Sequence, residues 1–393
     1  MSTGTVDGPC QPLSHDENED PNKADEEVGS GARKKTGRSK AQKDGATENI
    51  YRKISVINGE INKMDREQLK NRLADLKMDT RGVNDVLKKR LKSYYRNRKL
   101  MKANVRVPSS KPLYDYLLVI DFEATCEADT PDYPHEIIEF PIILVDVHKK
   151  TVVDEFHSFC KPVLNSQLSE FCTELTGITQ ADVDASETFP AVFQKAEEWM
   201  REKHLGDGNK FTIVTDGPWD MSRFLCLQCQ HSDQVFPRWA KKWINIRKTY
   251  GSFYKCRRKK LEDMLIYLGM KFEGKQHRGR DDSRNIARIA IRLIEDGCRV
   301  KVNEIIHNYP GAKYLKFSNI DAESTDSGDE DVDDECTEES NDKKKKDVKV
   351  QGSTHTDDRD ITKAIASLCI EDRGEKTEED VSDLIAYYKL QKS

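Results

Sequence analysis

The chain has 393 residues, 34% of them charged, and a net charge of −5 at pH 7. A mean hydropathy of −0.79 is too polar for one large globule throughout, so long disordered stretches are expected. The sequence predicts no membrane segment and no signal peptide, and ten cysteines without a framework spacing suit a reducing, intracellular compartment.

The N-terminal region divides into two parts of different charge. Residues 1–50, rich in Gly, Ser, Lys, Asp and Glu, are predicted to be a disordered tail. Within them, residues 33–35 are either a nuclear-import signal or solvated charge. Residues 51–106 hold 17 Lys or Arg against 6 acids, which predicts a segment that binds a polyanion.

Two helices are predicted inside this basic segment. The first has Asp65 as its expected N-cap, followed by leucines at helical spacing: Leu69, Leu73 and Leu76. An extended link through residue 82 leads to the second helix, whose predicted apolar face holds Val86, Leu87, Leu91 and Tyr94.

This helix–extension–helix, roughly residues 64–98, resembles a SAP domain, a small nucleic-acid-binding module. The resemblance assigns the module to residues 51–106 and implies that six residues bind RNA: Arg81, Gly82, Lys88, Lys89, Arg90 and Lys92. The alternative is a helical hairpin that only keeps the chain soluble.

The main domain is predicted over residues 107–318. Strands are expected at residues 116–122, 137–147, 151–160, 211–216 and 243–247. Helices are expected at residues 166–174, 189–203, 219–231, 258–268 and 281–296. Strands in series that then alternate with helices indicate an α/β fold with a mixed sheet flanked by helices.

The C-terminal region is predicted to be a tail. Residues 319–358 form an expected disordered linker, first acidic and then basic, in which Ser324 and Ser327 are candidates for phosphorylation. Residues 359–393 form either short partner-binding helices or nothing stable.

The chemistry begins with Asp121 and Glu123, which close an apolar run at residues 116–120. Side chains two apart on a strand share a face, so both carboxylates are expected to project together. They repel each other unless a proton or a cation lies between them. Phosphodiester hydrolysis needs an activated water and a neutralised phosphate, and two divalent cations on three or four carboxylates supply both.

Further candidates follow along the chain. Asp216 and Asp220 come after a buried strand, and spacing alone does not decide which is the third ligand. His277 lies in a loop before a helix that Asp281 or Asp282 begins. A neutral imidazole, with an ordinary pKa of about 6.5, can take a proton from water.

Asp-Phe-Glu, then a lone Asp, then His-x4-Asp resembles the histidine-bearing (DEDDh) exonuclease superfamily, which has an RNase H-like fold and a two-metal mechanism working 3′ to 5′. Four segments look like the 3′–5′ exoribonucleases that trim the histone mRNA stem-loop, also called the enhanced-RNAi type. These segments are residues 120–127, 135–141, 175–180 and 243–248. The resemblance covers about residues 51–308.

The resemblance implies a role for each matching residue. It implies metal binding by Asp121, Glu123, Asp220 and Asp282, and catalysis by Glu123 and His277, with His277 as the general base. Asp220 is preferred because the family's aspartate follows an aromatic residue, here Trp219. Contact with the terminal nucleotide is implied for Ala124, Phe171, Leu175, Thr176, Gly177, Ile178, Trp219 and His277. Trp219 suits core packing equally well.

The expected activity is Mg²⁺-dependent 3′–5′ exoribonuclease action with two ions per site, Mn²⁺ as a substitute, and nucleoside 5′-monophosphates as products. The implied substrates are the histone mRNA stem-loop, ribosomal RNA 3′ ends and small interfering RNA, held as a stem-loop or as a duplex with a 3′ overhang. The implied partners are the ribosome, a stem-loop-binding protein and the small-RNA machinery, in the cytoplasm and in the nucleus with its nucleolus.

Three alternatives stay open at this point. The first is a DNA 3′–5′ exonuclease that uses the same site, and the second is a non-catalytic RNA-binding scaffold. The third concerns Cys226 and Cys229, which are either zinc ligands or two core thiols on a helix.

Overall fold

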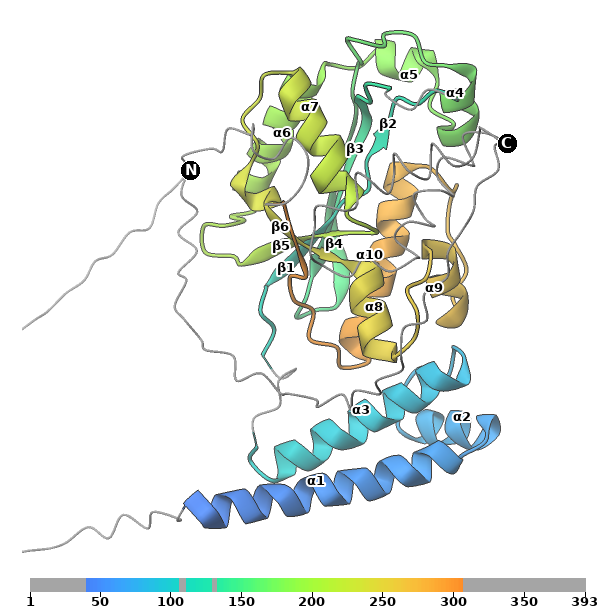
Figure 1. Cartoon of the computed structure of the whole chain (residues 1–393), viewed down its shortest axis with the longest axis vertical. Helices are drawn as coiled ribbons and strands as arrows, with labels where there is room; N and C mark the ends of the chain where they lie inside the picture. Colours follow the sequence, from blue (N-terminus) through green and yellow to red (C-terminus); the bar gives the residue numbers. More distant parts are fainter. Residues whose placement is uncertain (1–39, 106–110, 129–132, 307–393) are drawn as a thin grey trace, which may run out of the picture. The chain divides into compact units, whose positions relative to one another are not determined.

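The computed structural model describes residues 40–105, 111–128 and 133–306 (Figure 1). Residues 1–47 and 48–393 are separate compact units, and apart from the start of the first helix every element below belongs to the second unit. The predicted tail at 319–358, the serines Ser324 and Ser327 and the predicted helices at 359–393 lie outside the described residues. The predicted domain boundaries stay predictions.

Three helices precede the sheet: α1 (Lys40–Lys63), α2 (Arg66–Asp75) and α3 (Asn84–Lys102). Helix α1 begins inside the segment predicted to be disordered, so that prediction is wrong for residues 40–50. The predicted N-cap is confirmed, because the Asp65 side chain accepts a hydrogen bond from Gln68 N at 2.9 Å while Gln68 caps in return. Leucines of α2 and α3 pack together with Ile61 of α1.

Within the described ranges, seven strands form one mixed sheet. The strands are β1 (Tyr116–Val119), β2 (Glu123–Ala124), β3 (Ile137–Asp146), β4 (Thr151–Phe159), β5 (Phe211–Thr215), β6 (Lys242–Asn245) and β7 (Glu304–Ile305). Their order is β2-β3-β1-β5-β6-β7, with β4 also paired to β3. Strands β1, β5 and β6 are parallel, whereas β3 runs antiparallel to β1, β2 and β4.

Helices cover both faces of this sheet (Figure 1). They are α4 (Glu170–Thr176), α5 (Gln180–Asp184), α6 (Phe189–Glu202), the π-helix η2 (Asp220–Leu225), α7 (Cys226–His231), the 3₁₀ helix η3 (Arg238–Ala240), α8 (Ile246–Tyr254), α9 (Leu261–Tyr267) and α10 (Gly279–Glu295). One core lies under α6 and α7, and the other lies under α8, α9 and α10. The alternation of β1 separates them, since Leu118 faces the first core and Leu117 the second.

The structure departs from the predicted elements in two places near the sheet. Strand β1 ends at Val119, so Asp121 follows the strand and Glu123 begins the separate strand β2. The predicted strand over 243–247 ends at Asn245, whose side chain accepts a hydrogen bond from Lys248 N at 3.2 Å and caps α8. The second departure explains why α8 was missed, because the chain turns from strand to helix within one residue.

Among the described residues, none of the helices combines the length and the apolar character that crossing a bilayer requires.

Candidate active site

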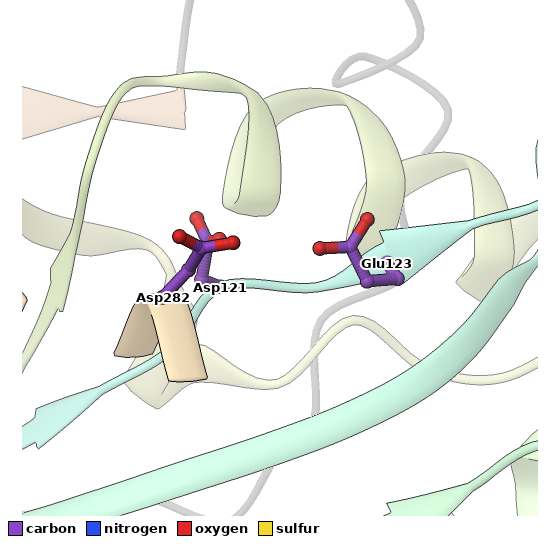
Figure 2. A group of neighbouring side chains, drawn as sticks. All are labelled: Asp121, Glu123 and Asp282. Carbon is purple, nitrogen blue, oxygen red and sulfur yellow. The ribbon is translucent and has the colours of Figure 1, made fainter. Parts of the chain in front are cut away.

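Three carboxylates from two distant parts of the chain meet at one end of the sheet. Oxygen atoms of Asp121, Glu123 and Asp282 all lie within 4.8 Å of one another. Asp121 follows β1, Glu123 begins β2, and Asp282 lies in the first turn of α10. Figure 2 shows the side chains of Asp121 and Asp282 next to each other, with Glu123 at the start of β2. Three of the four predicted ligands therefore come together as expected.

Electrostatics show that this group is under strong mutual repulsion. Burial, and then the charges of Asp220 and Asp282, raise the pKa of Asp121 well above its ordinary value. Burial and the charge of Asp282 do the same to the pKa of Glu123. Burial and the charge of Asp216 raise the pKa of Asp282 to about 8. Repelling hard oxygen donors in a half-buried position are the ligands that a divalent cation prefers, so these residues fit such an ion.

The fourth predicted ligand, Asp220, lies beside this group and outside the set of three. Its Oδ1 accepts a hydrogen bond from Phe122 N at 2.9 Å, which ties η2 to the segment between β1 and β2. Burial, followed by the charge of Asp216, raises the pKa of Asp220 to about 7 even though the Phe122 amide opposes this shift. The carboxylate thus belongs to the same acidic neighbourhood as Asp121.

Asp216, the rival of Asp220, has a different environment. Its Oδ2 accepts a hydrogen bond from Nη2 of Arg247, while its Oδ1 is buried without a hydrogen-bond partner. Its charge contributes to the raised pKa values of Asp121, Asp220 and Asp282. Asp216 is therefore an ion-paired neighbour of the acidic group.

His277 lies in the loop before α10, as predicted, and its side chain is exposed. Its φ of 57° lies in the left-handed region, which costs a residue other than glycine of the order of 1–3 kcal/mol. Nearby atoms desolvate the ring, and together with the charge of Lys275 they lower the pKa of His277. An exposed imidazole that stays neutral at pH 7 is available to accept a proton.

The loop that carries His277 is fastened on both sides. Arg278 N donates a hydrogen bond to Oδ2 of Asp282 at 3.1 Å. Nη1 of Arg278 donates to the carbonyl oxygen of Gly177 at 3.0 Å, which joins this loop to the end of α4. The position of His277 is therefore linked to the carboxylates and to the predicted nucleotide-binding segment.

Two residues that position α10 were missed as functional by sequence reasoning. Glu139 of β3 has no exposed surface, and its carboxylate accepts hydrogen bonds from Gly279 N at 2.9 Å and Arg280 N at 3.3 Å. Its Oε1 also lies 2.7 Å from Nε2 of His157. The carboxylate binds the first amides of α10, where the helix dipole favours negative charge.

Gly279 is the second missed residue. A Cβ at this position would lie 2.4 Å from the carbonyl oxygen of Asp121, closer than real Cβ atoms come. Only glycine lets the first turn of α10 approach the end of β1, and this approach brings Asp282 to Asp121. The glycine between His277 and Asp282 was the available signal in the sequence.

The predicted nucleotide-binding residues separate into two groups. Four of them are partly exposed: Phe171, Leu175, Gly177 and Trp219. Ala124 is 9% exposed. Thr176 and Ile178 are buried, and the Thr176 hydroxyl donates to the carbonyl oxygen of Cys172 at 2.8 Å. These two side chains shape the segment from inside, and contact between this segment and a nucleotide stays a prediction.

The predicted RNA contacts of the α2–α3 pair need a correction. Arg90 is 1% exposed and its guanidinium binds Asp296, so the prediction that it contacts RNA is wrong. Gly82 is buried too, and Lys89 lies over the ring of Phe253 at 4.4 Å. The side chain of Arg81 is 56% exposed while its Nη2 donates to Asp79 at 2.6 Å, and its contact with RNA stays a prediction.

Lys88 and Lys92, the other two predicted contacts, are partly exposed. Lys88 Nζ donates to the carbonyl oxygen of Asn62 at 3.1 Å, and Lys92 Nζ donates to its Oδ1 at 2.6 Å. Cys226 and Cys229 are buried in the core under α7, as the thiol interpretation predicts, and they join no candidate metal group among the described residues.

Comparisons with known proteins agree with this fold. The exonuclease family model matches residues 118–290. The 3′–5′ exoribonuclease 1 of Rattus norvegicus is 52% identical over 261 residues, covering 66% of this chain and 75% of the relative. The Homo sapiens counterpart is 51% identical, with 66% and 74% covered. A solved structure described as 3′-end specific recognition of the histone mRNA stem-loop by 3′-exonuclease is 50% identical, with a TM-score of 0.50, over 66% of this chain and 90% of that one.

The RNase H-like sheet and its acidic group define an exonuclease of the DEDDh class. Within this class, the chain belongs to the 3′–5′ exoribonuclease 1 family, whose members hydrolyse RNA from the 3′ end.

Proposed function

We propose that this chain is a Mg²⁺-dependent exoribonuclease that trims the 3′ ends of structured RNA and releases nucleoside 5′-monophosphates. The observation that supports this most directly is the group of Asp121, Glu123 and Asp282 within 4.8 Å. The charges that raise the pKa of Asp121 all come from other acids, so the site suits cations that compensate them.

The residues divide the chemistry among them. Asp121, Glu123 and Asp282 would hold two Mg²⁺ ions, with Asp220 from the same acidic neighbourhood as a fourth ligand and Mn²⁺ as a substitute. Bound cations of this kind supply positive charge to the scissile phosphate and the attacking water. His277 accepts the proton of this water, because its lowered pKa keeps the ring neutral near pH 7.

The substrate is proposed to be RNA with a duplex or stem-loop next to its 3′ end. The structural neighbour named above recognises the histone mRNA stem-loop by its title. In this chain the basic α2–α3 pair, which resembles a SAP domain, would hold the duplex with Arg81, Lys88 and Lys92. Such binding should weaken steeply with salt, because the cations contact phosphates.

Other RNAs fit the same proposal. Ribosomal RNA 3′ ends and small interfering duplexes also place a single-stranded 3′ end next to a helix. The proposed locations are the cytoplasm and the nucleus, which imaging of the tagged full chain would test.

The deciding experiment is a gel-resolved digestion in Mg²⁺ of three RNAs: a stem-loop with a 3′ tail, a blunt duplex and a single strand. Matched DNA versions of each are digested in parallel, and a Glu123→Gln protein serves as the control. We expect loss of single nucleotides from the 3′ end of the RNA stem-loop and slower loss from DNA, since a 2′-OH contact distinguishes the two.

The other outcomes support the rival functions. Equal degradation of DNA would favour the DNA exonuclease. Binding of the stem-loop without release of mononucleotides, in wild type and variant alike, would favour the scaffold.

A further inference from the structure

A buried ion pair joins helix α3 to the exonuclease domain. Nε and Nη2 of Arg90 donate to the two carboxylate oxygens of Asp296, at 2.6 and 3.0 Å. The two residues are 1% and 2% exposed. Nη1 of Arg90 donates to the carbonyl oxygens of Asp79 and Arg81, at 2.5 and 3.0 Å, so the guanidinium also orders the link between α2 and α3.

Other contacts surround this pair. Tyr254 of α8 donates its hydroxyl to Oδ2 of Asp296 at 2.8 Å. Nη2 of Arg292 lies 2.7 Å from Oδ2 of Asp79. Burial opposes ionisation of Asp79, but hydrogen bonds from Arg81 and the charge of Arg292 lower its pKa to about 2. Arg90 and Asp79 therefore each pair with an opposite charge near the C-terminal end of α10.

Backbone and apolar contacts extend the junction. Val83 N donates to the carbonyl oxygen of Tyr267 at 2.9 Å, and Val86 is buried in the core under α8 and α10. A Cβ at Gly269 would lie 2.6 Å from Gly82 N, so the two backbones approach closely here. Helix α3 lies against α8 (Figure 1). The α2–α3 pair is therefore a fixed part of this domain rather than a module on a free tether.

Helix α10 connects this junction to the site. Asp282 lies in its first turn, and Asp296 is its C-cap. At 1.5 Å per residue, the backbone positions of these two aspartates are about 21 Å apart along one helix. A continuous helix keeps this separation constant.

We infer that the Arg90–Asp296 pair fixes how far the exoribonuclease trims a structured RNA. This rests on the proposed function, in which α2 and α3 hold the duplex. With the duplex held at a constant distance from the carboxylates, the 3′ tail reaches the site only until a certain length remains. Arg90 is then a positioning residue that determines the end point of trimming and takes no part in hydrolysis.

The test compares product ends at single-nucleotide resolution on a stem-loop with a long 3′ tail. Arg90→Lys keeps the charge but loses the two-point contact, and Asp296→Asn keeps the shape but loses the charge. Arg98→Lys, an exposed position on the same helix, is the matched control. Hydrogen exchange of residues 82–92 reports whether α3 stays docked, because the Val83 amide is bonded to Tyr267.

Wild type and Arg98→Lys should stop at one tail length. In the two junction variants, exchange of residues 82–92 should become faster and the products should spread over several lengths. Hydrolysis of a single strand too short to reach α3 should change by less than about twofold, because Arg90 shares no contact with the carboxylates.

Two results would overturn the inference. In the first, the junction variants undock yet stop at the wild-type tail length. In the second, they lose hydrolysis of the short strand as much as they lose hydrolysis of the stem-loop. If the variants do not undock, Asp296→Ala, which leaves the Arg90 guanidinium buried without its partner, is tested as well. An unchanged stop in the undocked protein again rejects the inference, and so does a set of variants that all stay docked, because the pair then does not fix the junction. Failure of the proposed function differs from all of these, since wild type itself would then not bind or trim the stem-loop.

Discussion

The two ends of α10 each carry a buried aspartate in opposite electrostatic surroundings. At the first turn, Asp282 faces other acids, and burial with the charge of Asp216 raises its pKa to about 8. At the last turn, Asp296 binds the guanidinium of Arg90 and the hydroxyl of Tyr254. A buried charge that the protein compensates holds the structure together, whereas one that it leaves uncompensated favours an external cation.

The largest effect is expected from replacing the uncompensated acids that meet at the first turn of α10. Asp121→Asn or Glu123→Gln should lower kcat by about 10³-fold or more, because several kcal/mol of charge stabilisation depend on these oxygens. Stem-loop binding, measured by gel shift, should stay within about twofold, since the α2–α3 surface is distant. Asp207→Asn, at an exposed acid, is the control. Full activity of either variant in Mg²⁺ would reject the assigned roles.

At the last turn of α10, where the protein compensates the charge of Asp296, substitutions should change the free energy of unfolding more than the rate of hydrolysis. Asp296→Ala leaves the Arg90 guanidinium buried without its partner and should lower the free energy of unfolding by about 3–5 kcal/mol. Arg90→Met combined with Asp296→Leu should be much milder, because no charge is left unpaired. Urea unfolding of the two single variants and the double variant gives the coupling energy. Additive effects would show that the two residues do not act as a pair.

The distance between Asp121 and the first turn of α10 can be changed without replacing an acidic residue. Gly279→Ala places a methyl group 2.4 Å from the Asp121 carbonyl, so α10 must move away and Asp282 with it. We expect kcat to fall by about 10²-fold in steady-state assays, the cost of a misplacement near 1 Å. Gly217→Ala is the matched control, because its added Cβ meets nothing within 4 Å. Equal rates for the two variants would contradict the assignment of Gly279.

The smallest effect concerns pH and metal. Burial raises the pKa of Asp220 to about 7 and that of Asp282 to about 8, both from 3.8 in the unfolded chain. The folded protein therefore binds extra protons, so this contribution to stability is present below about pH 4 and lost as pH rises through 7 to 8. Mg²⁺ should raise the thermal midpoint at pH 8 much more than at pH 5.

The control for this prediction is Asp282→Asn, which removes one of the repelling charges. Its midpoint without metal should fall less between pH 5 and pH 8 than that of wild type. An identical fall in both proteins would place the pH dependence elsewhere in the chain.

Much of the fold follows from local patterns. The continuous apolar runs of β1 and β3, the helical spacing in α2, α3 and α10, and the cap at Asp65 are all readable from neighbouring residues. Helices α1 and α8 were missed, α1 because its first part is polar and lacks an apolar face, and α8 because it follows β6 without a turn. Local composition does not show where a strand ends when the next residue begins a helix.

The order of the acids and the histidine, together with their flanking residues, is enough to predict the site from the amino-acid sequence. The folded structure was needed to see that Asp121, Glu123 and Asp282 meet while Asp220 accepts from the Phe122 amide. It was also needed to see that Glu139 anchors α10 and that Arg90 binds Asp296. The reason is physical: whether a charge faces water, a cation or an opposite charge depends on residues brought near by folding, and these lie up to 206 positions away.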